Sequence, residues 1–318
     1  MSDERTLFEA RAQSGVAVSD ICETARRARA GDEAACRALA AAFAHCAFAA
    51  PSKIAATYDA AADGWLGCVV KAPAIAAFSE GVSQISTALW RDFWALVDGA
   101  APGIGAGEIT TRTAALGGLL ASDFREHAID AISAFPGVLD AAGQGIPPRF
   151  QLADLAACPE GSLGHTFYRL IVDNNFDLEV LDRDALGLSG LPQPLGYVNA
   201  RVLQSHDLWH ITAGYETTKL HEVAISAFQL AQFGHTYSAM FLAVVTASTA
   251  FRAQPAFALL TELILTAWVH GRTTPPMLGI NWESLWHLPT DEVRARCGIA
   301  PYQSPYPADL AEQLETAA

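Results

Sequence analysis

The stretch between Glu222 and Arg252 contains no Asp, Glu, Lys or Arg, and this gap in the charge pattern constrains the fold more than any other feature of the sequence. A charge-free stretch of this length either spans a membrane or lies buried inside a protein. Polar residues are spread through its first half, and a membrane span rarely tolerates so many of them. They are Ser226, Gln229, Gln232, His235, Thr236, Tyr237 and Ser238. The segment therefore predicts helical structure at the centre of a large core rather than a transmembrane helix.

The rest of the chain is also patterned for helices. From about Pro73 to Val97, apolar residues recur every three or four positions, which predicts an amphipathic helix. Glycines in residues 99–107 predict a loop, and a second amphipathic helix is expected to run from there to about Phe135. Because no alternating pattern is long enough to build a sheet, the sequence predicts an all-α, multi-helix, bundle-like fold.

The domain organisation follows from changes in composition. Residues from about 19 to 50 are Ala-rich and predict two short helices, so residues 1–50 are expected to form an N-terminal helical extension and residues 51–318 the main helical domain. Within that domain, the Gly- and Pro-rich residues 137–148 are the expected boundary between an N-terminal helical layer and the part that carries the chemistry.

Charge and cysteine usage limit the possible partners and compartment. The formal charge of −14 argues against nucleic acid as a partner and against electrostatic binding to an anionic membrane. The six cysteines have no Cys-x-x-Cys spacing, so they predict reduced thiols rather than a disulfide framework. The first residues are charged and contain no apolar signal stretch, so a cytoplasmic location is expected.

One short run, His206-Asp207-Leu208-Trp209-His210, has the spacing of a metal site. Residues four apart lie on the same face of a helix, so His206 and His210 can point at one cation. Asp207 falls within the same arc of roughly 100°. His-x-x-x-His also arises by chance, with both rings bonded to backbone or carboxylate groups. A carboxylate in the next helix favours the metal interpretation, because burying several ionisable groups is costly without a cation or tight pairing.

That carboxylate is Glu222. Gly214 has the position of a left-handed C-cap, and Thr217 or Thr218 that of the next N-cap, so the sequence predicts an αα-hairpin that lets Glu222 reach back to the histidines. Two imidazoles with one or two carboxylates suit a divalent metal ion, zinc first, with iron or manganese as alternatives. The pattern matches the His-Glu-x-x-His motif of zinc hydrolases only in part, so a metallohydrolase is not favoured.

The same residues resemble a known family. His-Asp-x-x-His, eleven residues and then Glu222 is similar to the metal-ligand signature of the ubiquinone (coenzyme Q) biosynthesis family Coq4. The resemblance is strong over residues 160–302, faint over 50–150 and absent before residue 50. Further matching segments are Gly161–Gly164 with Tyr168, Tyr197-Val198 with Arg201, residues 204–214, Gly271-Arg272, Trp282-Glu283, Val293-Arg294 and Gly298-Ile299. Leu203 departs from the family, which often has a basic residue there.

The resemblance implies metal-dependent oxidative decarboxylation, in which a hydroxyl replaces the carboxyl group of a polyprenylated hydroxybenzoate. It implies metal ligation by His206, His210 and Glu222, with Asp207 either a fourth ligand or a proton shuttle. Asp207 and Glu222 are then the expected catalytic residues. Expected substrate contacts come from Arg201 on the first helix and from Ser226 and Gln229 on the face of Glu222.

The resemblance also implies a location and partners. We expect a peripheral protein at the inner face of a bacterial membrane, forming a homo-oligomer and working with other ubiquinone biosynthesis proteins. The alternative is a non-catalytic scaffold that holds prenylated lipids for a biosynthetic complex. Lone histidines at 165, 235, 270 and 287, and the polar residues 173–179, are expected to be structural.

Overall fold

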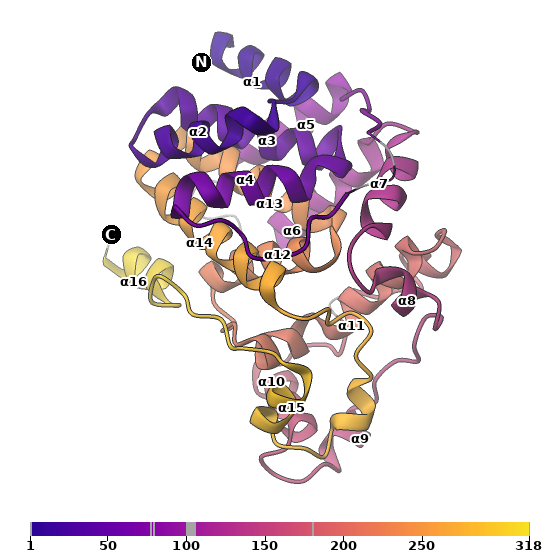
Figure 1. Ribbon diagram of the computed structural model, residues 1–318. Helices are drawn as coiled ribbons and strands as arrows, with labels where there is room; N and C mark the ends of the chain where they lie inside the picture. The colour runs from indigo at the N-terminus through magenta and orange to yellow at the C-terminus, as the bar shows by residue number, and fades with distance from the viewer. Residues whose placement is uncertain (1, 77, 79, 100–105, 180, 318) are drawn as a thin grey trace.

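The protein is a stack of helices around one apolar core (Figure 1). The computed structural model describes residues 2–76, 78, 80–99, 106–179 and 181–317. In these ranges the only β pairing is an isolated bridge between Ser162 and Pro289, so the all-α prediction is confirmed. The helices are α1 (Ser2–Ser14), α2 (Val18–Arg29), α3 (Glu33–Phe48), η1 (Pro51–Lys53), α4 (Ile54–Leu66), α5 (Thr87–Gly99), α6 (Ala106–Leu116), η2 (Gly117–Leu119), α7 (Phe124–Ser133), α8 (Val138–Ala142), α9 (Leu152–Ala156), α10 (Leu163–Asn174), η3 (Leu188–Gly190), α11 (Leu195–Ala213), α12 (Lys219–Phe233), α13 (Thr236–Arg252), α14 (Gln254–Thr273), η4 (Trp282–Leu285), α15 (Thr290–Cys297) and α16 (Leu310–Ala317).

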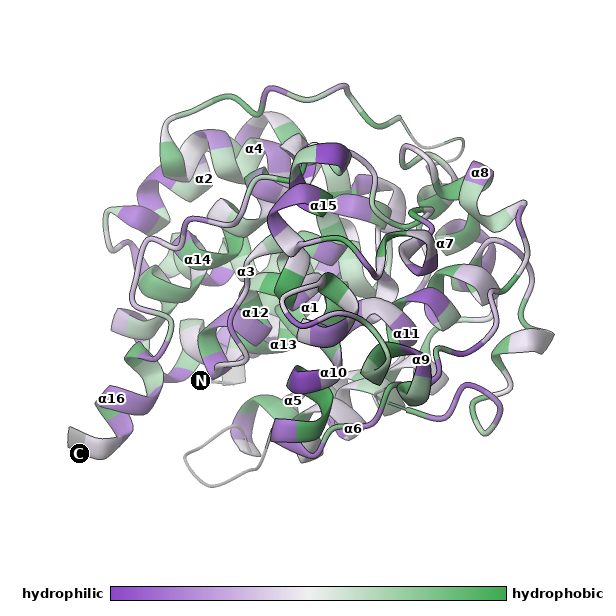
Figure 2. Cartoon of the chain, turned by 90° about the horizontal axis from the view of Figure 1, so that it is seen from below, coloured by the Kyte–Doolittle hydropathy of each residue, from purple (hydrophilic) through white to green (hydrophobic). Residues whose placement is uncertain are grey.

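The N-terminal helices and the charge-poor helices form one packed unit. Helix α3 packs along α13, and α12 packs along α14, so the indigo and orange segments of Figure 1 interleave. Residues 39–48 of α3 are all buried, and half of them are alanines, whose small side chains let neighbouring helices approach closely. Hydrophilic residues gather instead on peripheral helices such as α15 and α16 (Figure 2).

The charge-free stretch forms α12 and α13, which are separated at Gly234. This glycine has φ 64°, and a Cβ there would lie 2.6 Å from the ring of Phe135. Most residues of both helices are buried in protein, as the sequence predicts. Within the described ranges, no helix combines the length and apolar character that crossing a membrane requires.

The helix predicted from Pro73 to Val97 is wrong in its first half. Helix α5 begins only at Thr87, and the described residues before it are irregular. Phe78 is 73% exposed and Val82 is 47% exposed, so the apolar periodicity in this part does not mark a buried face. Gly81 lies against His127, where a Cβ would come within 2.0 Å of the ring. This contact holds in place the irregular segment before α5, which is called the strap below.

The second predicted helix, up to Phe135, is also wrong as a single element. It is divided into α6, η2 and α7, because Gly117 and Gly118 stand where the helix would have to continue. The loop expected at residues 99–107 falls mostly on residues 100–105, which lie outside the described part. The connection expected at residues 137–148 contains the short helix α8.

Candidate metal centre

A tight turn joins the two helices that carry the candidate ligands. Helix α11 ends at Ala213, and its C-cap residue Gly214 has φ 80° and donates its N–H to the carbonyl of His210. A Cβ on Gly214 would lie 2.9 Å from Cβ of Pro301, so only glycine fits the turn without a shift. Thr218 takes the N-cap position of α12, but its hydroxyl donates to Ala308 rather than capping its own helix. The two helices approach each other through the side chains described next, while α12 packs mainly against α14 and α13.

Three of the predicted residues converge at this turn. Nε2 of His206 lies 3.6 Å from Oε2 of Glu222, and Nε2 of His210 lies 3.3 Å from Oε1 of the same carboxylate. One candidate ligand atom from each residue lies within 4.8 Å of the others. Among the described residues, this is the His, Cys, Asp and Glu group close enough to hold one metal ion.

The tautomer of His210 is set by the turn. Its Nδ1 lies 3.2 Å from the carbonyl oxygens of both Tyr215 and Glu216. Because carbonyls only accept, Nδ1 carries a hydrogen, and it is Nε2 that faces Glu222, with a free lone pair whenever the ring is in its neutral form. Nε2 is buried and has no hydrogen-bond partner. A lone pair facing carboxylate oxygens at this distance requires a proton or a cation between them, so the donor set fits a metal ion.

Asp207 forms a hydrogen bond with the ring nitrogen of His206 that faces away from Glu222. Its Oδ1 lies 2.9 Å from Nδ1 of His206, so Nδ1 donates to the carboxylate and Nε2 again faces Glu222. Asp207 is therefore not among the three convergent groups, and it has the geometry of a carboxylate that orients a ligating imidazole.

Local charges adjust the protonation of two of these groups. Burial alone lowers the pKa of His206, but the hydrogen bond to Asp207 and the charges of Glu222 and Asp207 together raise it above the usual value. Burial alone raises the pKa of Glu222, yet the close approach of His210 and the other nearby histidines holds it below its usual value. Glu222 is consequently a carboxylate at neutral pH.

The structure adds one residue that sequence reasoning missed. Nδ1 of His221 accepts the backbone N–H of Glu216 at 2.7 Å, and the carbonyl of Glu216 in turn accepts from His210. Burial lowers the pKa of His221, which keeps its ring neutral and able to accept. Its ring lies edge-on to Tyr215 and Tyr302. No spacing rule marks this histidine, because the turn that it holds is defined only in the folded chain.

The expected substrate residues have different surroundings. Arg201 is buried, and its guanidinium donates to the carbonyls of Leu278 and Ile280 and to the side chain of Gln204, so it ties α11 to the loop before η4. Ser226 donates to the carbonyl of Glu222 within its own helix.

Of the three expected substrate-contacting residues, Gln229 has a hydrogen-bond donor without a partner in the protein. Its Oε1 accepts from Ser238, whose hydroxyl also pairs with Nδ1 of His235, while its Nε2 is buried without a partner. The histidine at 270 pairs with the hydroxyl of Tyr215 and the carbonyl of Ala300, in keeping with a structural role.

Comparisons with known proteins agree on one family. Residues 147–303 match the model of the family described as "Coenzyme Q (ubiquinone) biosynthesis protein Coq4". The mitochondrial ubiquinone biosynthesis protein COQ4 homolog of Rattus norvegicus is 32% identical over 150 residues, which are 47% of this chain and 55% of the relative. That of Mus musculus is 30% identical over 152 residues, covering 47% and 54%, and the COQ4 of Eremothecium gossypii is 28% identical over 153 residues, covering 48% and 46%.

The chain thus spans about half the length of the curated relatives that it matches. A crystal structure of a protein from Nostoc punctiforme PCC 73102, provisionally assigned to ubiquinone biosynthesis, covers 66% of this chain and 96% of its own. The TM-score is 0.51 and the sequence identity is 24%, which shows a shared fold.

Proposed function

Because residues 147–303 match the model of the Coq4 family, we propose that this chain acts in ubiquinone biosynthesis and that His206, His210 and Glu222 hold a divalent cation at its catalytic centre. The observation that carries the proposal is the convergence of the Nε2 atoms of two imidazoles on one anionic carboxylate. Two histidines and a glutamate leave open coordination positions, an arrangement that suits zinc and also accepts iron or manganese.

The proposed reaction replaces the carboxyl group of a polyprenylated hydroxybenzoate by a hydroxyl. The carboxyl carbon leaves as carbon dioxide, and the ring carbon gains oxygen in a two-electron oxidation, for which dioxygen or another co-substrate must supply the oxidant. A bound divalent cation supplies Lewis-acid stabilisation of negative charge on the substrate's carboxylate or phenolate oxygen.

The chain's own residues would then divide the remaining work. Glu222 remains anionic and contributes its carboxylate to the centre, while Asp207 holds the ring of His206 in the ligating tautomer and can exchange a proton with it at Nδ1. The partner-free Nε2 of Gln229, on the same helix as Glu222, is the proposed hydrogen-bond donor to a substrate oxygen. We propose that the protein works at the inner membrane face alongside other ubiquinone biosynthesis proteins, because its substrate carries a polyprenyl chain.

Metal content tests the centre directly. We expect about one equivalent of divalent metal per chain in freshly purified protein, measured by elemental mass spectrometry, and a loss to near zero in His206→Ala and His210→Ala. Circular dichroism should show that both variants remain helical. Equal metal content in the wild type and in folded variants would refute the proposed ligands.

Complementation separates catalysis from scaffolding. In a bacterial strain that lacks its own copy, Glu222→Gln should fail to restore ubiquinone, and the carboxylated precursor should accumulate, because the neutral amide binds the cation poorly. Glu216→Gln is the matched control, since that side chain is exposed and only its backbone serves the site. Normal ubiquinone levels with Glu222→Gln would favour the lipid-holding scaffold instead.

A further inference from the structure

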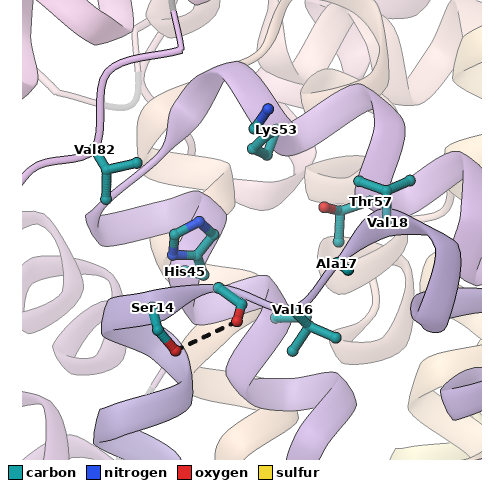
Figure 3. Close-up of a pocket in the computed structure, with 10 residues that line it drawn as sticks. Ser14, Val16, Ala17, Val18, His45, Lys53, Thr57 and Val82 are labelled. Atoms are coloured by element: carbon teal, nitrogen blue, oxygen red, sulfur yellow. Dashed lines mark hydrogen bonds between the residues drawn. The ribbon is translucent and has the colours of Figure 1, made fainter.

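A cavity of about 270 Å³ lies among the N-terminal helices, apart from the metal centre. It is lined by the turn between α1 and α2 and by residues of α3, η1, α4 and the strap before α5 (Figure 3). Every lining residue precedes position 83, so the cavity lies outside residues 147–303, which carry the family match.

His45 gives this cavity a hydrogen-bond acceptor. Its Nδ1 lies 2.8 Å from the carbonyl oxygen of Ala12, so Nδ1 carries the hydrogen and Nε2 keeps a lone pair. Burial lowers the pKa of His45, and the charge of Lys53 lowers it further, so the ring is neutral at pH 7.

Glycine at position 15 leaves room beside that acceptor. Gly15 has φ 77°, and a Cβ there would lie 2.7 Å from Nε2 of His45. Any other residue at position 15 would therefore place its side chain against Nε2 of His45.

Lys53 gives the cavity a positive charge whose present partner is an exposed carboxylate. Its Nζ lies 2.9 Å from Oε1 of Glu80, whose side chain is 82% exposed. An ion pair with such an exposed partner contributes little, so an anionic ligand can take the place of Glu80.

The remaining wall is largely apolar. Val16, Val18 and Val82 line the cavity, and Figure 3 shows the ring of His45 between Val82 and Ser14, with Lys53 and Thr57 across from it. An apolar wall with a few placed polar groups is the usual composition of a small-molecule site, although this volume suits only a small ligand.

We propose that this cavity binds a small organic anion that carries a hydrogen-bond donor. The donor pairs with Nε2 of His45, the anionic group lies beside Lys53, and the apolar body of the ligand packs on the three valines. The site does not depend on the metal centre, since the two share no residues.

Calorimetric titration of the full chain tests the site with 4-hydroxybenzoate as the probe. We expect a Kd on the order of 0.1–1 mM, as befits a ligand of about ten heavy atoms. Benzoate lacks the donor and 4-hydroxybenzamide lacks the charge, so each should bind about tenfold more weakly. No measurable binding of 4-hydroxybenzoate, or equal binding of benzoate, would overturn the proposal.

Variants locate the binding. Lys53→Met should weaken binding of 4-hydroxybenzoate about tenfold and leave 4-hydroxybenzamide unchanged. Lys71→Met, at an exposed lysine outside the cavity, is the matched control. Val82→Trp, on the irregular strap, should fill the mouth of the cavity and abolish binding of both probes. Binding that survives both Lys53→Met and Val82→Trp lies elsewhere, at the metal centre for instance, and also overturns the proposal.

Discussion

At the scale of single residues, the direction in which His210 points depends on a neighbouring histidine. His221 fixes the N–H of Glu216, and the carbonyls of Tyr215 and Glu216 fix Nδ1 of His210. His221 therefore positions a proposed ligand without contacting the ion. A positioning role predicts that the hydrogen-bond acceptor matters, whereas a packing role predicts that only the volume of the ring matters.

Two substitutions separate these roles. His221→Phe keeps an aromatic ring between Tyr215 and Tyr302 but removes the acceptor, so we expect metal affinity to fall about 10- to 100-fold. His221→Asn places an amide oxygen near the position of Nδ1 and should restore most of the affinity. The absorption spectrum of bound Co²⁺ reports both the affinity and the ligand geometry. Wild-type affinity in His221→Phe would leave His221 with a packing role only.

His235 predicts how stability depends on pH. Burial lowers the pKa of this histidine from 6.5 to about 3, so the folded protein keeps it neutral. Below pH 6.5 this histidine is protonated in the unfolded chain but stays neutral in the folded chain. The free energy of unfolding therefore falls as the pH falls towards 3. Between pH 7 and pH 5, this one group should cost about 2 kcal/mol.

The contribution of His235 is isolated by comparing His235→Asn with the wild type. Asparagine cannot titrate and suits the N-cap position that residue 235 occupies at the start of α13. Urea unfolding at pH 7 and pH 5 should show a smaller loss of stability in the variant. Identical losses in the two proteins would mean that His235 becomes protonated in the folded state as readily as in the unfolded one.

Single residues were predictable where a local rule applies. The placement of His206 and His210 on one face follows from helical spacing, and Gly214 was placed at the C-cap by its position after the motif. The internal pairing of Arg201 was not predictable, because its partners at Leu278 and Ile280 are far away in the sequence.

At the scale of elements, the turn between α11 and α12 sets the distance between the proposed ligands. Gly214→Ala forces an alanine into a left-handed conformation and against Pro301, so we expect a loss of about 2 kcal/mol or more in urea unfolding, together with weaker metal binding. Gly67→Ala is the matched control, since Gly67 also has a positive φ but would meet no atom within 4 Å. Its cost should be about 1 kcal/mol. Equal costs for the two variants would contradict a tight contact at Gly214.

Element boundaries were less predictable than element type. Apolar spacing before Thr87 imitates a helix face, but the strap is fixed by distant contacts, such as Ser83 with the backbone of Ala49 and the side chain of His127. Local periodicity carries no information about such partners. The charge-free stretch was correctly interpreted as core, because its composition alone excludes a solvated surface.

At the scale of the whole molecule, Asp59 of α4 joins the N-terminal helices to the part that matches the family. It accepts hydrogen bonds from Nε1 of Trp268 at 2.8 Å and from the guanidinium of Arg272, whose side chain is 3% exposed. Helix α3 also packs along α13, so the first 50 residues share the core with the rest of the chain. The division into an N-terminal extension (residues 1–50) and a main domain (residues 51–318), which the sequence suggested, stays a prediction.

Removing Asp59 should loosen this junction. Asp59→Ala leaves the buried Arg272 without its anionic partner, although Pro73 still accepts from it, and we expect a loss of about 2–3 kcal/mol in urea unfolding. Glu292→Ala breaks the exposed pair with Arg296 and should cost about 0.5 kcal/mol or less. If both variants lost about 0.5 kcal/mol of unfolding free energy or less, the Asp59 junction would contribute no more to stability than a surface ion pair.

The uneven exposure of the three converging groups has a consequence for how the proposed ion would enter and leave. The His210 side chain is 2% exposed, whereas that of Glu222 is 45% exposed. Rotation of one half-exposed carboxylate opens the centre while both helices stay in place, and side chains change rotamer far faster than proteins unfold. We therefore expect loading of the proposed site to need only side-chain motion: a chelator should strip the folded protein, and added zinc should refill it, without a refolding step.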